Sequence, residues 1–145
     1  MEGLTKLYSS FIKEQNERPF HFGKKPEAQF ILKAYNPVCG DRFEIFIGER
    51  SSVSQEIHFH GFGCAISKAS TSMMAKTLSG KSNQDALALC NEFLAFMDKK
   101  IDTSGLTLGN DFTAFAGVHD FPERYECVVL SWLVMKEFLE SQPLM

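Results

Sequence analysis

A chain of 145 residues and 16.4 kDa can bury one sizeable core, and we expect residues 1–145 to form a single domain. Its formal net charge of −3 gives no basic surface, so nucleic acid is not an expected partner. No secretory leader or bilayer-length apolar run is visible, which predicts no membrane partner, a cytoplasmic location and reduced cysteines. Its 14 phenylalanines predict an aromatic core or an aromatic docking face.

The first part of the chain combines a helical pattern with two strand-like patterns. Apolar residues recur at helical spacing from residue 3 to about 15, and Arg18-Pro19 is expected to end this helix. Residues 17–37 are mixed in character and contain three prolines, which predicts a long, ordered connection. Residues 42–47 and 53–59 alternate with period two around a short polar turn, and this predicts an antiparallel hairpin.

Two helices are predicted to follow the hairpin. Gly61-Phe62-Gly63 is expected to break the strand and to place Cys64 at the start of a helix that runs to about Leu78. Ser82 is a suitable N-cap for the next helix. Cys90 falls on the apolar stripe of that helix, so we interpret it as a structural core residue.

The last third of the chain contains one more predicted helix. Residues 101–118 are rich in glycine and are expected to form a loop, whereas Pro122 suits the first turn of a final helix. The predicted fold class is therefore α+β, with a small antiparallel sheet of about three strands and helices packed on one side.

Three of the four cysteines stand beside a predicted turn or helix start, where backbone N–H groups favour a thiolate. Cys39 lies in the turn sequence Asn36-Pro37-Val38-Cys39-Gly40-Asp41, so its thiolate and the Asp41 carboxylate can converge on one ion. Cys64 follows a glycine-bearing turn, and Cys127 lies about one turn into the final helix. Three thiolates and one carboxylate suit zinc or one corner of an iron–sulfur cluster. Spacing alone leaves open the alternative that Asp41 caps a turn and the cysteines are small buried hydrophobes.

The histidines give weaker signals. His58 and His60 flank Phe59, so both are expected on the opposite, solvated face of the sheet. His60 is near enough in sequence to Cys64 to be a reserve ligand, and His119 is expected to be a loop residue.

Three blocks of the chain carry a resemblance to a known family. They are Asn36-Pro37-Val38-Cys39-Gly40-Asp41-Arg42, Gly61-Phe62-Gly63-Cys64-Ala65-Ile66-Ser67-Lys68-Ala69-Ser70 and Pro122-Glu123-Arg124-Tyr125-Glu126-Cys127. In order, separation and flanking glycines they resemble the IscU/NifU N-terminal family of iron–sulfur cluster assembly proteins. The chain is most similar to the SufU branch, because it has an insertion before Cys127 and because Glu126 stands where the scaffold type has a histidine.

The resemblance implies a zinc-dependent sulfurtransferase with one zinc per chain, held by Cys39, Asp41, Cys64 and Cys127. It implies that Cys39 accepts persulfide sulfur from a SufS-type, PLP-dependent cysteine desulfurase, for delivery to a downstream iron–sulfur assembly scaffold. Arg124 matches a basic position that would help docking or orient the persulfide. Two alternatives remain: a scaffold that holds a nascent [2Fe-2S] cluster on the same ligands, and a zinc-stabilised binding module without sulfur transfer.

Overall fold

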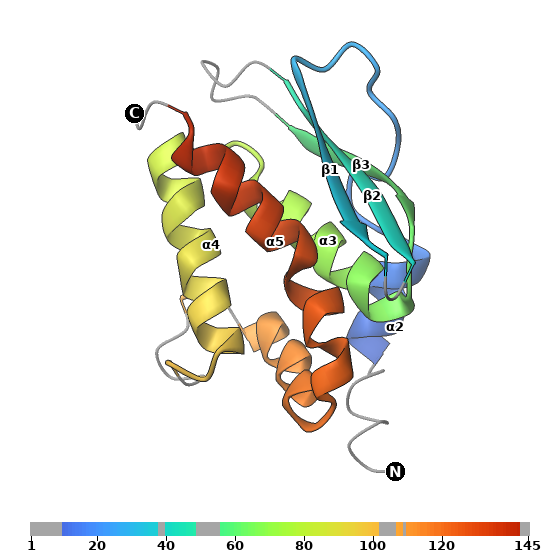
Figure 1. The fold of residues 1–145 in the computed structure, drawn as a ribbon, viewed down its shortest axis with the longest axis vertical. Helices are drawn as coiled ribbons and strands as arrows, with labels where there is room; N and C mark the ends of the chain where they lie inside the picture. Colours follow the sequence, from blue (N-terminus) through green and yellow to red (C-terminus); the bar gives the residue numbers. More distant parts are fainter. Residues whose placement is uncertain (1–9, 38–39, 49–55, 102–106, 109, 143–145) are drawn as a thin grey trace.

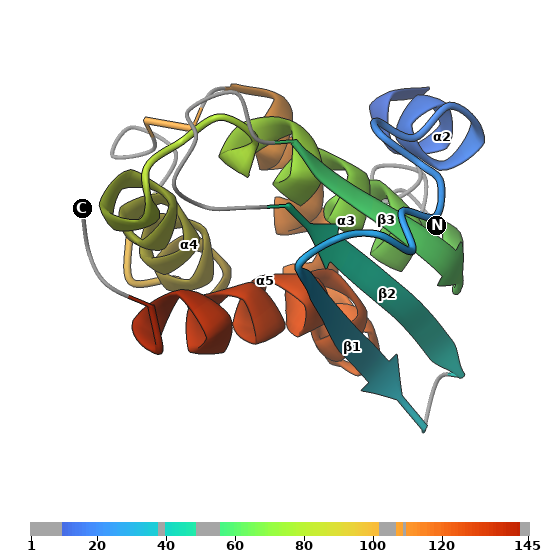
Figure 2. The same cartoon turned by 90° about the horizontal axis from the view of Figure 1, so that it is seen from above.

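The computed structural model describes residues 10–37, 40–48, 56–101, 107–108 and 110–142. Helices cover one face of a three-stranded sheet (Figures 1 and 2). In chain order the elements are α2 (Ser10–Glu17), β1 (Phe30–Asn36), β2 (Asp41–Ile47), β3 (Ile57–Phe62), α3 (Ala65–Leu78), α4 (Asn83–Met97), the 3₁₀ helices η2 (Asn110–Asp120) and η3 (Pro122–Arg124), and α5 (Tyr125–Glu140). Within these described ranges, no helix has the length and apolarity needed to cross a membrane. The predicted α+β class is confirmed.

The sheet has the strand order β1-β2-β3 and is antiparallel throughout. The predicted hairpin pairing is confirmed, because β2 pairs with β3 in a register that places Ile45 opposite Phe59 and Ile47 opposite Ile57. These four side chains are fully buried on the face that the helices cover, as the period-two pattern predicted. Residues 49–55, which include the predicted turn and the start of the predicted second strand, lie outside the described part.

Strand β1 corrects the prediction that residues 17–37 form a connection. Phe30–Asn36 pairs with β2 along its whole length. Of its seven residues only Ala34 is buried, and the others alternate between half-buried and exposed. The exposed face nevertheless carries Ile31 and Tyr35, so the residue types do not alternate clearly between apolar and polar. The extended conformation of β1 depends on a partner strand that a local sequence window does not show.

Helices α3 and α5 form the layer that covers the sheet. α3 contacts β3, α5 contacts β1, and α4 packs against α5 on the side away from the sheet (Figure 2). The predicted helix after Cys64 is confirmed, and so is the Ser82 cap, whose Oγ accepts a hydrogen bond from the backbone N–H of Asp85 at 3.1 Å. Cys90 is fully buried in the core, also as predicted.

Helix η2 corrects the prediction of a loop at residues 101–118. Residues 102–106 and 109 lie outside the described part, but residues 110–120 form a 3₁₀ helix. Phe112, Phe115 and Val118 recur every three residues, which matches the three residues per turn of a 3₁₀ helix, and all three are buried. Burial of these three side chains in the core therefore stabilises a helix in a segment whose glycines predicted a loop.

The final α-helix begins at Tyr125, three residues later than predicted. Pro122 opens the short helix η3 instead, and the N–H of Arg124 donates to the carbonyl of Phe121 at 2.8 Å in the i→i+3 pattern of a 3₁₀ turn. Cys127 is consequently the third residue of α5, closer to the helix start than expected.

Buried hydroxyl groups join α3 to α5. Ser70 Oγ donates to the carbonyl of Val128 at 2.5 Å and accepts from Trp132 Nε1 at 3.0 Å, while the Thr71 and Ser131 hydroxyls are 2.7 Å apart. Small side chains allow the two helices to approach closely, and these bonds satisfy the polar groups that the approach buries. The contact at Val128 fixes the first turn of α5 against α3.

A segment before β1 lies along the outer edge of β3. Gly23 N–H donates to the carbonyl of Phe59 at 2.8 Å, and Phe59 N–H donates to the carbonyl of His21 at 3.1 Å. Because this segment packs beside β3, the prediction of a solvated face is wrong for His58, whose side chain is only 16 % exposed.

Candidate metal site

Asp41 is the first residue of β2 and is fully buried. The preceding turn is closed by a hydrogen bond from Gly40 N–H to the carbonyl of Asn36 at 2.8 Å, with Gly40 at a φ of 78°. The Asp41 carboxylate reaches the start of α3, where Oδ1 accepts from the backbone N–H of Cys64 at 3.1 Å and from Ser67 Oγ at 3.2 Å. Asp41 therefore links the start of β2 to the first turn of α3.

Cys64 is the N-cap residue of α3, and glycines on its N-terminal side let the chain approach Asp41. A Cβ on Gly61 would lie 2.0 Å from the carbonyl oxygen of Arg42, and a Cβ on Gly63 would lie 2.6 Å from Asp41 Oδ1. A side chain at either position would therefore collide with β2. The two glycines explain why this strand-to-helix turn can pass directly over the carboxylate.

Cys127 lies at the start of α5, far from Asp41 and Cys64 in the sequence. Its side chain is buried, with 2 % of the residue exposed. The neighbouring residue, Val128, is held to α3 through the 2.5 Å bond from Ser70 Oγ. The hydroxyl contacts between α3 and α5 thus position Cys127 beside Cys64.

Asp41, Cys64 and Cys127 bring their ligand atoms together, with all three atoms within 4.8 Å of one another. Within the described part of the chain, the second carboxylate oxygen of Asp41, Oδ2, is buried and has no hydrogen-bond partner. Such an orphaned, buried carboxylate oxygen is costly unless a cation satisfies it. A carboxylate beside two thiols is also a donor set that suits zinc. These residues therefore fit a bound metal ion.

The thiol of Cys64 is strongly perturbed. Its hydrogen bond with the Cys127 thiol is the largest influence and lowers the pKa; burial raises it, Ser67 lowers it further, and the Asp41 charge raises it. The net result is a pKa of about 5 for Cys64. At neutral pH this side chain is a thiolate, the form that both metal binding and nucleophilic attack require.

The remaining predicted site residues have different positions. Cys39 lies outside the described residues, two positions before Asp41 in the chain. Arg124 is half-buried in η3, three residues before Cys127, and Glu126 is an exposed acidic residue in the first turn of α5, where the helix dipole favours negative charge.

Two of the histidines lie apart from the three ligand atoms. Within the described part of the chain, His60 does not belong to the Asp41 group, and its ring lies 4.9 Å from that of Phe22. His119 is in η2 rather than in a loop, and its Nε2 makes a hydrogen bond with the carbonyl oxygen of Met97 at 2.9 Å.

Ser67 is a site residue that the sequence reasoning missed. Its hydroxyl lies 3.6 Å from Cys64 Sγ and donates to Asp41 Oδ1, so it links the thiol to the carboxylate. The available signal was its place three residues after an N-cap cysteine, on a helix face of small residues. The neighbouring small side chains Ser70 and Thr71 contact α5, whereas Ser67 contacts the site.

Comparison with known proteins identifies the family of this chain. Residues 7–128 match the model of the NifU-like N terminal domain. The chain is 33% identical to the iron–sulfur cluster assembly scaffold protein IscU of Streptococcus pyogenes serotype M1, over 94% of this chain and 85% of that protein. It is 32% identical to the zinc-dependent sulfurtransferase SufU of Bacillus subtilis (strain 168), over 92% of this chain and 90% of that protein.

A solved structure shares the architecture as well. The crystal structure of FiSufU from the thermophile Fervidobacterium islandicum AW-1 superimposes with a TM-score of 0.82 at 27% identity, over 93% of this chain and 98% of that one. The matched family model spans both β2 and the start of α5, so it includes Asp41, Cys64 and Cys127. This chain belongs to the NifU-like N-terminal domain family.

Proposed function

We propose that this protein is a zinc-dependent sulfurtransferase that accepts persulfide sulfur from a SufS-type cysteine desulfurase for iron–sulfur cluster assembly. The observation that carries the proposal is the convergence of Asp41, Cys64 and Cys127 around an orphaned carboxylate oxygen. The similarity to a protein named as a zinc-dependent sulfurtransferase supports it. On this proposal residues 1–145 act as a single domain in the reducing cytoplasm, which keeps the thiols available.

Four residues would hold one zinc ion: Asp41, Cys64 and Cys127, together with Cys39, which the structure does not describe. A bound zinc would keep the thiolates deprotonated without adding redox chemistry of its own. Ser67 and the Cys64 backbone N–H orient the Asp41 carboxylate through the 3.2 Å and 3.1 Å bonds to Oδ1. The carboxylate is therefore fixed through one oxygen and presents the other.

Sulfur transfer would then proceed by exchange at Cys39. The Cys39 thiolate attacks the outer sulfur of the desulfurase cysteine persulfide, a new sulfur–sulfur bond forms, and the desulfurase thiolate leaves. One persulfide is consumed and one is formed, so no oxidant or reductant is needed. Arg124, whose cationic side chain stands just before α5, would attract the anionic persulfide or an acidic surface of the partner.

A scaffold that holds a nascent [2Fe-2S] cluster is the second candidate function. It is favoured by the 33% identity to a protein named as an iron–sulfur cluster assembly scaffold, over nearly the whole of this chain. The same thiolates and carboxylate can ligate iron, so ligand chemistry does not separate the two candidates.

Metal analysis combined with a desulfurase assay distinguishes them. We expect about one zinc per chain in the purified protein and a clear stimulation of desulfurase turnover that Cys39→Ala abolishes. Cys90→Ala is the matched control, because Cys90 is buried in the core away from the site and its loss should leave stimulation intact. Iron with matching sulfide and little stimulation would indicate the scaffold. Zinc with stimulation that survives Cys39→Ala would refute sulfur transfer through Cys39.

A further inference from the structure

A second group of metal-ligating side chains lies at the opposite end of β3 from Cys64. His21, Glu56 and His58 place one ligand atom each within 4.8 Å of one another. Glu56 directly precedes β3, whereas Cys64 comes two residues after the last residue of that strand. A strand of this length spans about 20 Å, so the two groups are separate sites.

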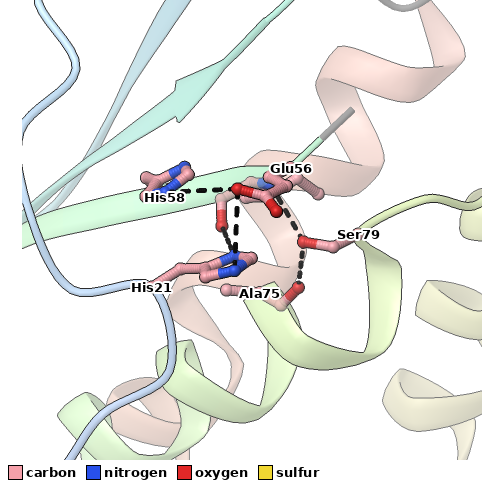
Figure 3. A network of polar contacts seen from close by, with 6 residues as sticks. His21, Glu56, His58, Ala75 and Ser79 are labelled. Carbon is pink, nitrogen blue, oxygen red and sulfur yellow. Dashed lines mark hydrogen bonds and ion pairs between the residues drawn. The ribbon is translucent and has the colours of Figure 1, made fainter. Parts of the chain in front are cut away.

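The two imidazoles converge on one carboxylate oxygen (Figure 3). Nε2 of His21 lies 3.8 Å and Nε2 of His58 lies 3.7 Å from Glu56 Oε2. These separations are too long for direct hydrogen bonds. Two ligands of a tetrahedral zinc, each about 2.0–2.2 Å from the ion, are about 3.3–3.6 Å apart. The two nitrogen-to-oxygen separations are therefore only slightly longer than those between two ligands of one zinc ion.

The tautomer of His21 points its free lone pair into the group. Its Nδ1 donates to the carbonyl of Ile57 at 3.0 Å, since a carbonyl oxygen can only accept. In the neutral ring this leaves Nε2 unprotonated and facing Glu56. A histidine that donates one ring N–H to a backbone carbonyl is the usual arrangement of a histidine that binds metal through the other nitrogen.

The backbone beneath the group is held by helix α3. Ile57 N–H donates to Ser79 Oγ at 2.9 Å, and Ser79 Oγ donates to the carbonyl of Ala75 at 2.6 Å (Figure 3). The segment that carries His21 is itself fixed to β3 by backbone bonds on both sides of Phe59. The imidazole rings of His21 and His58 are stacked with centroids 4.5 Å apart and an interplanar angle of 13°, which holds both rings beside Glu56. One ring must turn for the two in-plane lone pairs to meet on one ion.

We propose that His21, Glu56 and His58 form a second metal site, which binds a zinc-type divalent cation. Two imidazole nitrogens and one carboxylate select first-row ions such as zinc over magnesium or calcium, which prefer oxygen ligands. Glu56 and His58 also line a hollow of about 280 Å³ on the protein surface, together with Lys25 and Glu27. The group therefore borders space in which water or a small anionic ligand fits.

The test uses the full-length protein after its first equivalent of zinc has been added, so that the Asp41 group is filled. A second equivalent of zinc is titrated while the imidazole resonances are followed by NMR, since the chain has only four histidines. The resonances of His21 and His58 should shift, and those of His60 and His119 should stay unchanged. Calorimetry should show a second binding event that weakens at least about tenfold in Glu56→Gln.

His60→Asn is the matched control. His60 is on the same strand and the same face as His58, but it lies outside the group. Glu56 has a side chain that is 58 % exposed, so Glu56→Gln should fold normally even if a histidine variant does not. The proposal is overturned if no second event occurs up to about 1 mM zinc, or if His60→Asn weakens it as much as Glu56→Gln does.

Discussion

Replacing Asp41 by asparagine separates the two roles that the structure gives this side chain. The asparagine would keep the shape of the residue and an oxygen that can accept from Cys64 N–H and Ser67 Oγ, which now donate at 3.1 Å and 3.2 Å. It would replace Oδ2, which has no hydrogen-bond partner among the described residues, by an amide nitrogen, which cannot bind a metal ion. The substitution therefore preserves the link between β2 and α3 and removes the proposed ligand.

The expected effects on stability and on zinc affinity differ in size. Neutralising the acceptor weakens both hydrogen bonds, while the removal of a fully buried charge offsets that loss, so the free energy of unfolding of the metal-free protein should change by no more than about 2 kcal/mol. Structural zinc sites with four ligands contribute about 10–16 kcal/mol, and a quarter of this is about 2.5–4 kcal/mol. We therefore expect Asp41→Asn to bind zinc about 100-fold to 1000-fold more weakly.

Competition with a chromophoric chelator measures the affinity, and urea unfolding of the metal-free protein measures the stability. Glu126→Gln is the control, because it removes an exposed carboxylate next to Cys127 and should change zinc affinity by less than about fivefold. If Asp41→Asn bound zinc as tightly as this control, Asp41 would not be a ligand, and its burial would serve only to join β2 to α3.

Three further predictions concern the same site. In metal-free protein, the rate of Cys64 alkylation should follow a pKa of about 5, and this pKa should rise in Cys127→Ala. Because the pKa is depressed, Cys64 stabilises the folded state at high pH, and this stabilisation is lost as the pH falls from 9 to about 5. A free energy of unfolding that stayed constant over this range would contradict the prediction. Gly63→Ala should lower the free energy of unfolding by about 1–3 kcal/mol and also weaken zinc binding, because the added Cβ would lie 2.6 Å from Asp41 Oδ1. An unchanged urea midpoint would show that the Asp41 carboxylate can move away freely. Arg124→Ala should reduce sulfur acceptance in the desulfurase assay more than zinc content, and equal losses would assign Arg124 a structural role.

Much of the fold followed from local patterns. The helix after Cys64 was predictable because glycines precede it and apolar residues recur along it, and the Ser82 cap because a serine hydroxyl there satisfies a free backbone N–H. The β2–β3 hairpin was visible because each strand buries one face. Strand β1 and helix η2 were not, because β1 is defined by its pairing with β2 and η2 by the burial of Phe112, Phe115 and Val118 in the core.

The candidate site divides in the same way. The sequence alone pointed to a metal site, because thiols and a carboxylate stand beside predicted turns. The resemblance of three sequence blocks also indicated the family, and the comparison confirmed it. It could not show that Ser67 joins Asp41 to Cys64.

Only the tertiary structure decided which side chains meet. Contacts between α3 and α5 bring Cys127 to Cys64, 63 positions earlier in the chain, and the pairing of the His21 segment with β3 brings His21 to Glu56 and His58. Spacing in a sequence constrains neighbours within a few residues, whereas long-range contacts depend on how whole elements pack. For that reason the sequence predicted a solvated His58, and the folded chain instead covers it with His21.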